Sequence, residues 1–262
     1  MAHRGRITIV TGTDTDVGKT IATATIAAAL VEAGRKVAIV KPVQTGLPPR
    51  RPDIVDGDVD IAARLSGAST ALEGVRFTRP MAPRQAARLE GRCLPNLEVH
   101  CALIDDAAAT HDEVLVEGAG GMLVELAPQR TIVDLALALR QRCHVSVSST
   151  ASQTCPAPDQ HPSGDPCANV RVLVVTRSRL GTLNHTALTI EALTARSLTP
   201  AGIVIGSWPE QPDEIDRENL SDLRAGSTPV LATIPAGLGQ VEPEEFRRRV
   251  REIADLHHPP AC

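Results

Sequence analysis

Short runs of apolar residues alternate with helical patterns along almost the whole chain. The apolar runs lie at residues 7–10, 37–40, 114–116, 172–175, 203–205 and 230–234, and helical patterns lie among them at residues 20–33, 61–65, 97–109, 133–139 and 187–196. Strands this apolar are typical of a parallel sheet whose two faces are covered by helices. The sequence therefore predicts an α/β fold, a single domain over residues 1–262 with a mostly parallel central sheet. Such sheets bind ligands at the carboxyl ends of their strands.

The core of this fold has to be aliphatic, because the chain contains only two Phe, one Trp and no Tyr. This composition disfavours proteins that stack nucleic-acid bases on aromatic side chains. The formal net charge is −4, and the longest basic run, Arg247 to Arg249, lies beside Glu244 and Glu245 on a helical pattern. We interpret that run as a solvated helix face, and we expect neither a nucleic acid nor a membrane as a partner.

The expected location is cytoplasmic. The sequence contains no run of about 18 apolar residues, the length that a membrane-spanning helix needs. Residues 1–6 lack the features of a secretory signal. The six cysteines, at positions 93, 101, 143, 155, 167 and 262, form no Cys-x-x-Cys pair. We therefore interpret them as reduced thiols.

Residues 141–169 interrupt the alternation. This segment is rich in Ser, Thr, Pro, Gln and Cys, and it contains Pro156, Pro158, Pro162 and Pro166. We predict a disordered surface insert within the domain, with an error in the gene sequence as the alternative. Its cysteines and histidines match no spacing of a structural zinc site.

The first loop with functional residues is GTDTDVGKT, residues 12–20. It follows a strand and opens a helix, the context that a phosphate-binding loop requires, although its spacing is one residue longer than the common form. Backbone N–H groups at the helix N-terminus would bind phosphates. Lys19 would reach the outer phosphates, and the Thr20 hydroxyl would bind Mg²⁺. The expected fold is thus that of a P-loop NTPase.

Lysine is rare in this chain, because only Lys19, Lys36 and Lys41 occur among 27 Lys and Arg residues. Lys41 opens KPVQTG, residues 41–46, at the end of the second strand, so two of the three lysines come to one sheet edge. A compact ammonium on a flexible stem suits a phosphoryl or carboxyl group in transfer better than Arg does. Lys41 is therefore a catalytic candidate, with a surface lysine as the alternative, and Lys36 is expected to be a surface charge.

Carboxylates occur in two further loops. Asp56, Asp58 and Asp60 alternate in a polar loop without the glutamate that ends a calcium-binding loop. We expect one of them to bind Mg²⁺, with a solvated loop or a helix cap as the alternative. Glu117 ends the apolar run 114–116 and precedes three glycines within residues 118–121. A buried carboxylate requires a partner, which a metal would supply, and the glycines would let the backbone approach phosphate.

The last such loop is GTLNHT, residues 181–186, which opens a helix. Its backbone N–H groups form an anion site, suitable for a carboxylate. His185 is a candidate catalytic base, but a structural role in the helix is the stronger interpretation.

Taken in chain order, GTDTDVGKT, KPVQTG, the Asp58 loop, VEGAGG at residues 116–121 and GTLNHT resemble one family, the dethiobiotin synthetases. The resemblance covers residues 7–234 apart from the insert. It implies an enzyme that uses ATP and Mg²⁺ to join CO₂ to 7,8-diaminononanoate in biotin synthesis. In this family one amine forms a carbamate, the carbamate takes the γ-phosphoryl group, and the second amine closes the ureido ring as phosphate leaves.

The resemblance also implies roles for individual residues. Lys19 and Lys41 would stabilise the carbamate and the transferring phosphoryl group, and Thr20, Asp58 and Glu117 would hold Mg²⁺. Thr15 and Asp16 would lie near the diamine, which Thr45 would contact through its hydroxyl. The substrate carboxylate would bind the helix start of a partner subunit, so a homodimer is expected; the residues there are Gly181, Thr182, Leu183 and Asn184. The nucleotide would contact Asp16, Val17, Gly18, Lys19, Thr20, Asp58, Glu117, Gly118, Ala119, Gly120, Gly206, Ser207, Pro235, Ala236 and Gly237.

Three features depart from the family pattern. Many relatives end the late strand in an Asn that reads adenine, whereas this chain has Gly206, Ser207 and Trp208 there. The expected nucleotide is therefore ATP or another triphosphate such as CTP. Asp16 stands where Glu is common, which shortens the reach toward the amines. The insert precedes the strand that leads to Gly181, and we expect its deletion to leave activity intact.

Three other functions fit parts of the sequence. A regulatory or partitioning P-loop ATPase would carry an additional Lys where this chain has Asp14. A cobyrinate-type amidation enzyme is a second alternative, against which KPVQTG and GTLNHT favour the diamine enzyme. An inactive relative that serves as a binding module is the third, and it would require the insert to disrupt the site.

Overall fold

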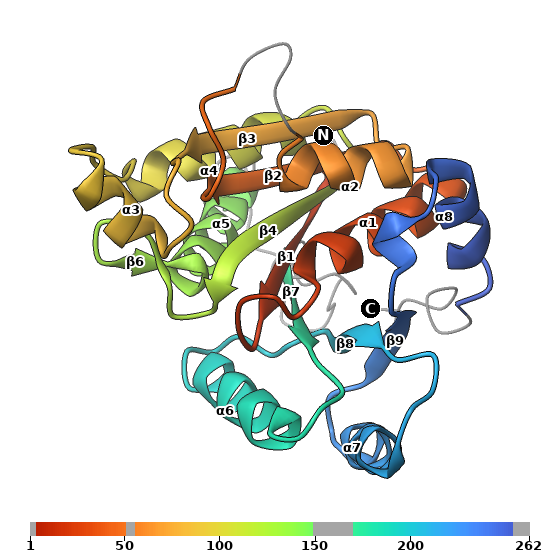
Figure 1. Ribbon diagram of the computed structural model, residues 1–262. Coiled ribbons are helices and arrows are strands. Elements are labelled where there is room, and N and C mark those ends of the chain that lie inside the picture. Colours follow the sequence, from red (N-terminus) through yellow and green to blue (C-terminus); the bar gives the residue numbers. More distant parts are fainter. Residues whose placement is uncertain (1–3, 51–55, 149–169, 254–262) are drawn as a thin grey trace, which may run out of the picture.

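A seven-stranded parallel sheet forms the centre of the protein (Figure 1). The computed structural model describes residues 4–50, 56–148 and 170–253. The strand order is β3-β2-β4-β1-β7-β8-β9. The strands are β1 (Arg6–Gly12), β2 (Val37–Gln44), β3 (Thr70–Arg76), β4 (Glu113–Gly121), β7 (Val170–Thr176), β8 (Gly202–Trp208) and β9 (Val230–Pro235). A separate antiparallel pair consists of β5 (Glu125–Ala127) and β6 (Arg130–Thr131).

Helices cover both faces of the sheet, as the sequence predicts. One face packs against α1 (Lys19–Glu32), α2 (Asp58–Ser66) and α8 (Pro243–Val250), and the other against α3 (Pro83–Leu89), α4 (Leu97–Ala108) and α5 (Ile132–Ser148). The helices α6 (Thr182–Thr194) and α7 (Glu214–Ala225) lie beside β7, β8 and β9. Within the described ranges, no helix is long and apolar enough to cross a membrane.

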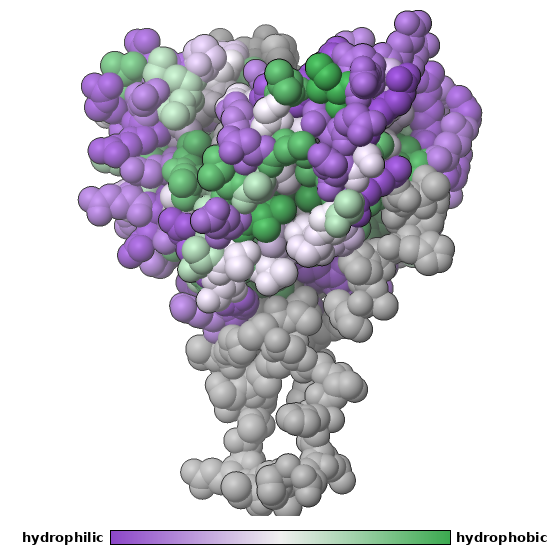
Figure 2. Space-filling model, turned by 90° about the horizontal axis from the view of Figure 1, so that it is seen from below, coloured by the Kyte–Doolittle hydropathy of each residue, from purple (hydrophilic) through white to green (hydrophobic). Residues whose placement is uncertain are grey.

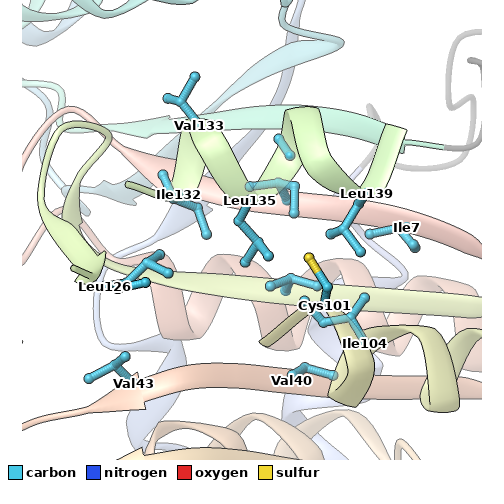
Figure 3. Packing of buried hydrophobic residues seen from close by; sticks show 14 of the residues in the cluster. Ile7, Val40, Val43, Cys101, Ile104, Leu126, Ile132, Val133, Leu135 and Leu139 are labelled. Carbon is cyan, nitrogen blue, oxygen red and sulfur yellow. The ribbon is translucent and has the colours of Figure 1, made fainter. Parts of the chain in front are cut away.

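The buried layers are aliphatic. Figure 3 shows Val40 on β2, Ile104 on α4 and Leu135 on α5 directed into the same layer. The neighbouring residue Ile39 packs on the opposite face, with α1 and α2, because side chains alternate along a strand. Each face contains one fully buried phenylalanine. Phe77 packs on the face of α3, α4 and α5, and Phe246 packs on the face of α1, α2 and α8.

Two element boundaries differ from the sequence-based prediction. The strand β2 continues past Val40 through Lys41 to Gln44, because the unpredicted strand β3 pairs along its outer edge, with Gln44 opposite Arg76. The helix α5 continues to Ser148 and so includes residues 141–148, where the sequence analysis placed the beginning of the insert. The first proline of that segment comes only at Pro156, so none interrupts the helix. The remainder of the predicted insert, residues 149–169, lies outside the described residues.

The strand order determines where ligands can bind. The strand β1 lies between β4 and β7, although β2 and β3 come next in the chain. The carboxyl ends of β1, β2 and β4 therefore adjoin at one sheet edge, at a reversal of strand order where α/β sheets form their ligand crevices.

Candidate active site

A cavity of about 780 Å³ opens at the carboxyl ends of β1, β2 and β4. It brings together the phosphate-binding loop, the KPVQTG segment, the start of α2 and the glycine-rich end of β4. The lining residues are Thr15, Asp16, Gly18, Lys19, Thr20, Ile21, Lys41, Gln44, Thr45, Asp58, Pro80, Met81, Ala82, Pro83, Glu117, Ala119, Gly120 and Val124.

The phosphate-binding loop is held by close backbone packing against the end of β8. Asp16 and Gly18 both have left-handed backbone angles, with φ of 56° and 93°. A Cβ on Gly18 would lie 2.5 Å from the Gly206 carbonyl oxygen, and a Cβ on Gly206 would lie 2.0 Å from that of Val17. The structure thus gives Gly206 a packing role beneath the loop, and its predicted contact with the nucleotide stays a prediction.

Lys19 lies inside this loop and is 7% exposed. Its Nζ donates a hydrogen bond to the Asp14 carbonyl oxygen at 2.8 Å. Burial lowers the pKa of the Lys19 ammonium, and the nearby Lys41 ammonium adds to this lowering, against the opposing effect of Glu117. Lys19 is therefore a cation whose positive charge is only partly compensated, as a site for phosphates requires.

Lys41 is 5% exposed and lies between two carboxylates. Its Nζ donates to Glu117 Oε1 at 2.8 Å and also pairs with Asp58 Oδ2. Burial lowers the pKa of Lys41, but the Glu117 and Asp58 carboxylates outweigh it, so the net shift is upward. Lys36, by contrast, is exposed. The two lysines that were expected at the sheet edge do meet there, and the third is on the surface.

Glu117 is the most enclosed charged residue of the site, at 1% exposure. Its Oε1 accepts hydrogen bonds from Lys41 and, at 2.9 Å, from the Thr20 hydroxyl. Its Oε2 is buried without a hydrogen-bond partner in the described part of the chain. A buried carboxylate oxygen without a partner is unfavourable, so Glu117 has an acceptor free for a cation.

The three aspartates of the polar loop have different surroundings. Asp58 is the first residue of α2 and pairs with Lys41. Asp60 accepts a hydrogen bond from the Gly57 N–H at 2.9 Å, as in a helix cap. Asp56 lies in the solvent, with a side chain that is 55% exposed. The structure thus selects Asp58 for the site, whereas Asp60 and Asp56 match the structural alternatives.

One wall of the cavity was not predicted from the sequence. Residues 80–83 follow β3 and border the cavity from the side of KPVQTG. Two backbone hydrogen bonds hold this segment beside the end of β2. The Gly46 N–H donates to the Arg79 carbonyl oxygen at 3.1 Å, and the Phe77 N–H donates to the Gln44 carbonyl oxygen at 2.9 Å. The prolines at 80 and 83 were the available signal, but without β3 nothing placed them near β2.

Several predicted nucleotide contacts lie outside the cavity. Val17 and Gly118 are buried and do not line it. Ser207 and residues 235–237 are exposed at the paired ends of β8 and β9, where the Ala236 N–H donates to the Trp208 carbonyl oxygen at 2.7 Å. The short turn that follows β9 packs closely against the start of α1, because a Cβ on Gly239 in this turn would lie only 2.3 Å from Ile21 Cδ1.

The start of α6 also lies outside the cavity. Gly181, Leu183 and Asn184 are exposed there, as is His185. Thr182 is fully buried, and its hydroxyl bonds Thr176 Oγ1 at 2.7 Å and the Arg177 carbonyl oxygen at 2.6 Å. The Thr182 hydroxyl is thus enclosed in this network, and the predicted binding of the substrate carboxylate by the start of α6 stays a prediction.

Comparison with known proteins adds a family to this geometry. Residues 6–149 and 167–244 match the family described as AAA domain. The chain is 44% identical over 246 residues to the ATP-dependent dethiobiotin synthetase BioD of Rhodococcus jostii, covering 92% of this chain and 90% of that protein. It is 42% identical over 243 residues to the protein of the same name from Mycobacterium avium, covering 92% and 91%.

Solved structures with lower sequence identity share the fold. Cobyrinic acid a,c-diamide synthase of Mycobacterium smegmatis, with bound ADP and magnesium, superposes with a TM-score of 0.53 at 18% identity, covering 97% of this chain and 95% of that one. The septum site-determining protein MinD of Pyrococcus horikoshii, complexed with Mg-ADP, gives a TM-score of 0.51 at 17% identity, covering 97% and 91%. These likenesses confirm the predicted P-loop NTPase fold and say nothing of this chain's substrates.

Proposed function

This chain belongs to the family of ATP-dependent dethiobiotin synthetases, and we therefore propose that its cavity at β1, β2 and β4 joins CO₂ to 7,8-diaminononanoate. The observation that carries the proposal is the convergence of Lys19, Lys41 and Glu117 in one enclosed site. The relatives at more than 40% identity favour this ligase over a partitioning ATPase or a cobyrinate-type enzyme, to which the likeness is in fold alone.

The donor set fits Mg²⁺. Thr20 offers a hydroxyl, Asp58 and Glu117 offer carboxylates, and the Glu117 Oε2 atom has no other partner within the described residues. Mg²⁺ is commonly held by one or two carboxylates together with substrate phosphates. Within the described ranges no group of three or more His, Cys, Asp or Glu residues could hold a metal alone, so the nucleotide would complete the site. When bound, the ion neutralises charge on the phosphates.

The two lysines would divide the reaction between them. Lys19 opens α1, so it would bind the outer phosphates together with the N–H groups at the helix start. Lys41 is fixed by carboxylates on two elements, so its ammonium would lie where the carbamate meets the γ-phosphoryl group. In that step a carbamate oxygen bonds to phosphorus and the bond to the β-phosphate oxygen breaks. The second amine then attacks the carbamate carbon, and phosphate leaves.

The cavity wall suits the rest of the substrate. Pro80, Met81 and Val124 present apolar surface to the cavity, which would pack against an aliphatic chain. Thr15 and Thr45 add hydroxyls on the side of the lysines. For the nucleotide base, the exposed edge formed by Ser207 and Trp208 offers no amide side chain of its own, which supports CTP as an alternative to ATP.

We propose a homodimer in which α6 meets the other subunit. Leu180 is 81% exposed just before α6, and Leu188 is 55% exposed on it. Figure 2 views the molecule from the side of α6 and α7 and shows apolar residues gathered in the middle of this face, with hydrophilic residues around them. A patch of this kind marks an interaction surface. The N–H groups at Gly181, Leu183 and Asn184 would then bind the substrate carboxylate in the partner's cavity.

A cytoplasmic location completes the proposal. Cys93 and Cys101, the cysteines whose side chains are described, are free thiols, which agrees with a reducing compartment.

The test is product formation. The protein is incubated with diaminononanoate, bicarbonate, Mg²⁺ and ATP, and dethiobiotin is measured by mass spectrometry. We expect dethiobiotin in proportion to phosphate released; phosphate release without dethiobiotin would contradict the proposal and favour an ATPase. Competition between ATP and CTP in the same assay decides the base preference, and a strong preference for ATP would exclude the CTP alternative.

A further inference from the structure

Gln44 is a buried polar side chain of the cavity to which the proposed reaction assigns no role. It is the last residue of β2 and is 4% exposed. Its Oε1 accepts a hydrogen bond from the Asp58 backbone N–H at 3.1 Å, and its Nε2 donates to the Thr45 carbonyl oxygen at 3.0 Å. One side chain thus bonds to the start of α2 and to the residue that follows β2.

The two partners determine the orientation of the amide. One is a donor and the other an acceptor, so a flipped amide would oppose N–H to N–H and oxygen to oxygen. Each polar atom of the Gln44 side chain therefore has a defined partner. The bond to Asp58 also meets a need of the helix, because the first N–H groups of an α-helix have no partner within it.

A helix usually satisfies those N–H groups with the side chain of its N-cap residue. The N-cap of α2 is Gly57, which has no side chain. The carboxylate of Asp60 accepts from the Gly57 N–H and leaves the Asp58 N–H without a partner on α2. Gln44 supplies from β2 the acceptor that the helix itself lacks.

We propose that Gln44 is a positioning residue that fixes the first turn of α2, so that the Asp58 carboxylate faces Lys41 and the proposed metal site. The proposal rests on the function proposed above, because it takes Asp58 as a metal ligand. Groups that hold a ligand in place without contacting the metal typically change metal affinity by about 10- to 100-fold when they are removed.

The first experiment examines the metal-free protein. Hydrogen exchange at the Asp58 amide is compared between wild type, Gln44→Met, which removes both hydrogen bonds, and Gln44→Glu, which keeps an acceptor. We expect faster exchange at Asp58 in Gln44→Met and a smaller increase in Gln44→Glu, which keeps the acceptor for the Asp58 N–H but loses the donor to the Thr45 carbonyl oxygen. Gln141→Met, an exposed Gln-to-Met change on α5, is the control and should leave this exchange unchanged. Unchanged protection in Gln44→Met would overturn the inference.

The second experiment measures Mn²⁺ binding by electron paramagnetic resonance in the presence of a non-hydrolysable ATP analogue. We expect affinity to fall about 10-fold in Gln44→Met and to fall less in Gln44→Glu, which retains the acceptor for the Asp58 N–H. Asp58→Asn distinguishes the two proposals. If it lowers affinity while Gln44→Met does not, the inference about Gln44 is wrong and the metal site stands. If Asp58→Asn has no effect, the proposed metal site is wrong, and the role of Gln44 falls with it.

Discussion

The carboxyl ends of β1, β2 and β4 and the start of α1 bring predicted site residues to one cavity, whereas the start of α6 after β7 leaves its motif on the surface. In the first region Lys19, Lys41 and Glu117 are each less than 10% exposed, and Glu117 accepts a hydrogen bond from Lys41. At the start of α6, Gly181 and Asn184 are exposed and line no part of that cavity. The sheet order explains the difference, because β4 lies between β2 and β1 while β7 lies on the far side of β1.

Motifs that are equally clear in the sequence thus differ in the structure. Only some of them meet other predicted site residues within one subunit. In the cavity region two carboxylates of the same subunit enclose the Lys41 ammonium. The α6 region places exposed leucines beside the start of a helix, and we propose above that a second subunit meets it. Three substitutions test this contrast, and a fourth lies outside both regions.

The largest effect is expected from Lys41→Met in the cavity. Removing a charge that stabilises a transferring group typically lowers kcat by about 10²- to 10³-fold, and here Glu117 also loses a buried partner. Steady-state assays of dethiobiotin formation measure the effect, with urea unfolding to confirm that the variant folds. Lys36→Met, at the exposed lysine, is the matched control and should keep the wild-type rate. An unchanged rate in Lys41→Met would contradict its proposed role.

Gly206→Ala tests the close packing between the end of β8 and the phosphate-binding loop. The added Cβ would lie 2.0 Å from the Val17 carbonyl oxygen, so the phosphate-binding loop has to shift. We expect weaker nucleotide binding in a calorimetric titration and a loss of about 1–3 kcal/mol in the free energy of unfolding, as for other overpacked sites. Unchanged nucleotide affinity and unchanged free energy of unfolding in Gly206→Ala would show that the close approach does not position the loop.

The α6 region is tested by Leu188→Glu, which places a charge on the exposed face of α6. We expect a shift from dimer to monomer in sedimentation experiments and a rise of about tenfold in KM for the diamine, the loss of one carboxylate contact of about 1.4 kcal/mol. Nucleotide affinity should stay unchanged, because the cavity that binds phosphates belongs to one subunit. Val99→Glu is the control, since Val99 on α4 is exposed to a similar degree, 57% against 55%. A dimer that survives Leu188→Glu would place the interface elsewhere.

The smallest effect is expected from His100, which lies in neither region. It is buried on α4 and its Nε2 bonds the Leu126 carbonyl oxygen at 3.0 Å. Burial lowers the pKa of His100 below its ordinary 6.5, against the raising effect of that hydrogen bond. The unfolded chain therefore binds the proton first, so stability should fall as the pH drops below 6.5. Urea unfolding at about pH 7.5 and pH 5.5 measures this. The loss of unfolding free energy between the two pH values should be smaller in His100→Gln than in wild type, and a variant of the exposed His185 should match wild type. Equal losses in wild type and both variants would assign the pH dependence to other groups.

Much of the site could be predicted from the sequence because its signals are local. The phosphate-binding loop needs only a strand, a glycine-rich turn and a helix in succession, so Lys19 and Thr20 were identified by their neighbours. The expectation for Lys41 came from its place at the end of a strand and from the scarcity of lysine. Parallel strands direct their carboxyl ends to one edge, so residues that end such strands are expected to lie together.

Other parts could not be predicted because they depend on which strands adjoin. The loop pattern alone left Asp56, Asp58 and Asp60 as alternatives, and only the family resemblance pointed to Asp58, which the start of α2 places beside Lys41. The wall at residues 80–83 needed β3, a strand whose pattern is only partly buried and therefore weak.

The amino-acid sequence alone was enough for the fold class and the family, since periodicity and motif spacing are properties of neighbouring residues. The tertiary structure was needed to show that Gln44 serves the Asp58 N–H, that Gly206 supports the phosphate-binding loop and that the Thr182 hydroxyl is enclosed. Gln44 and Gly206 contact residues that are distant in the chain. Helix starts and strand order set these separations, and no local pattern encodes them.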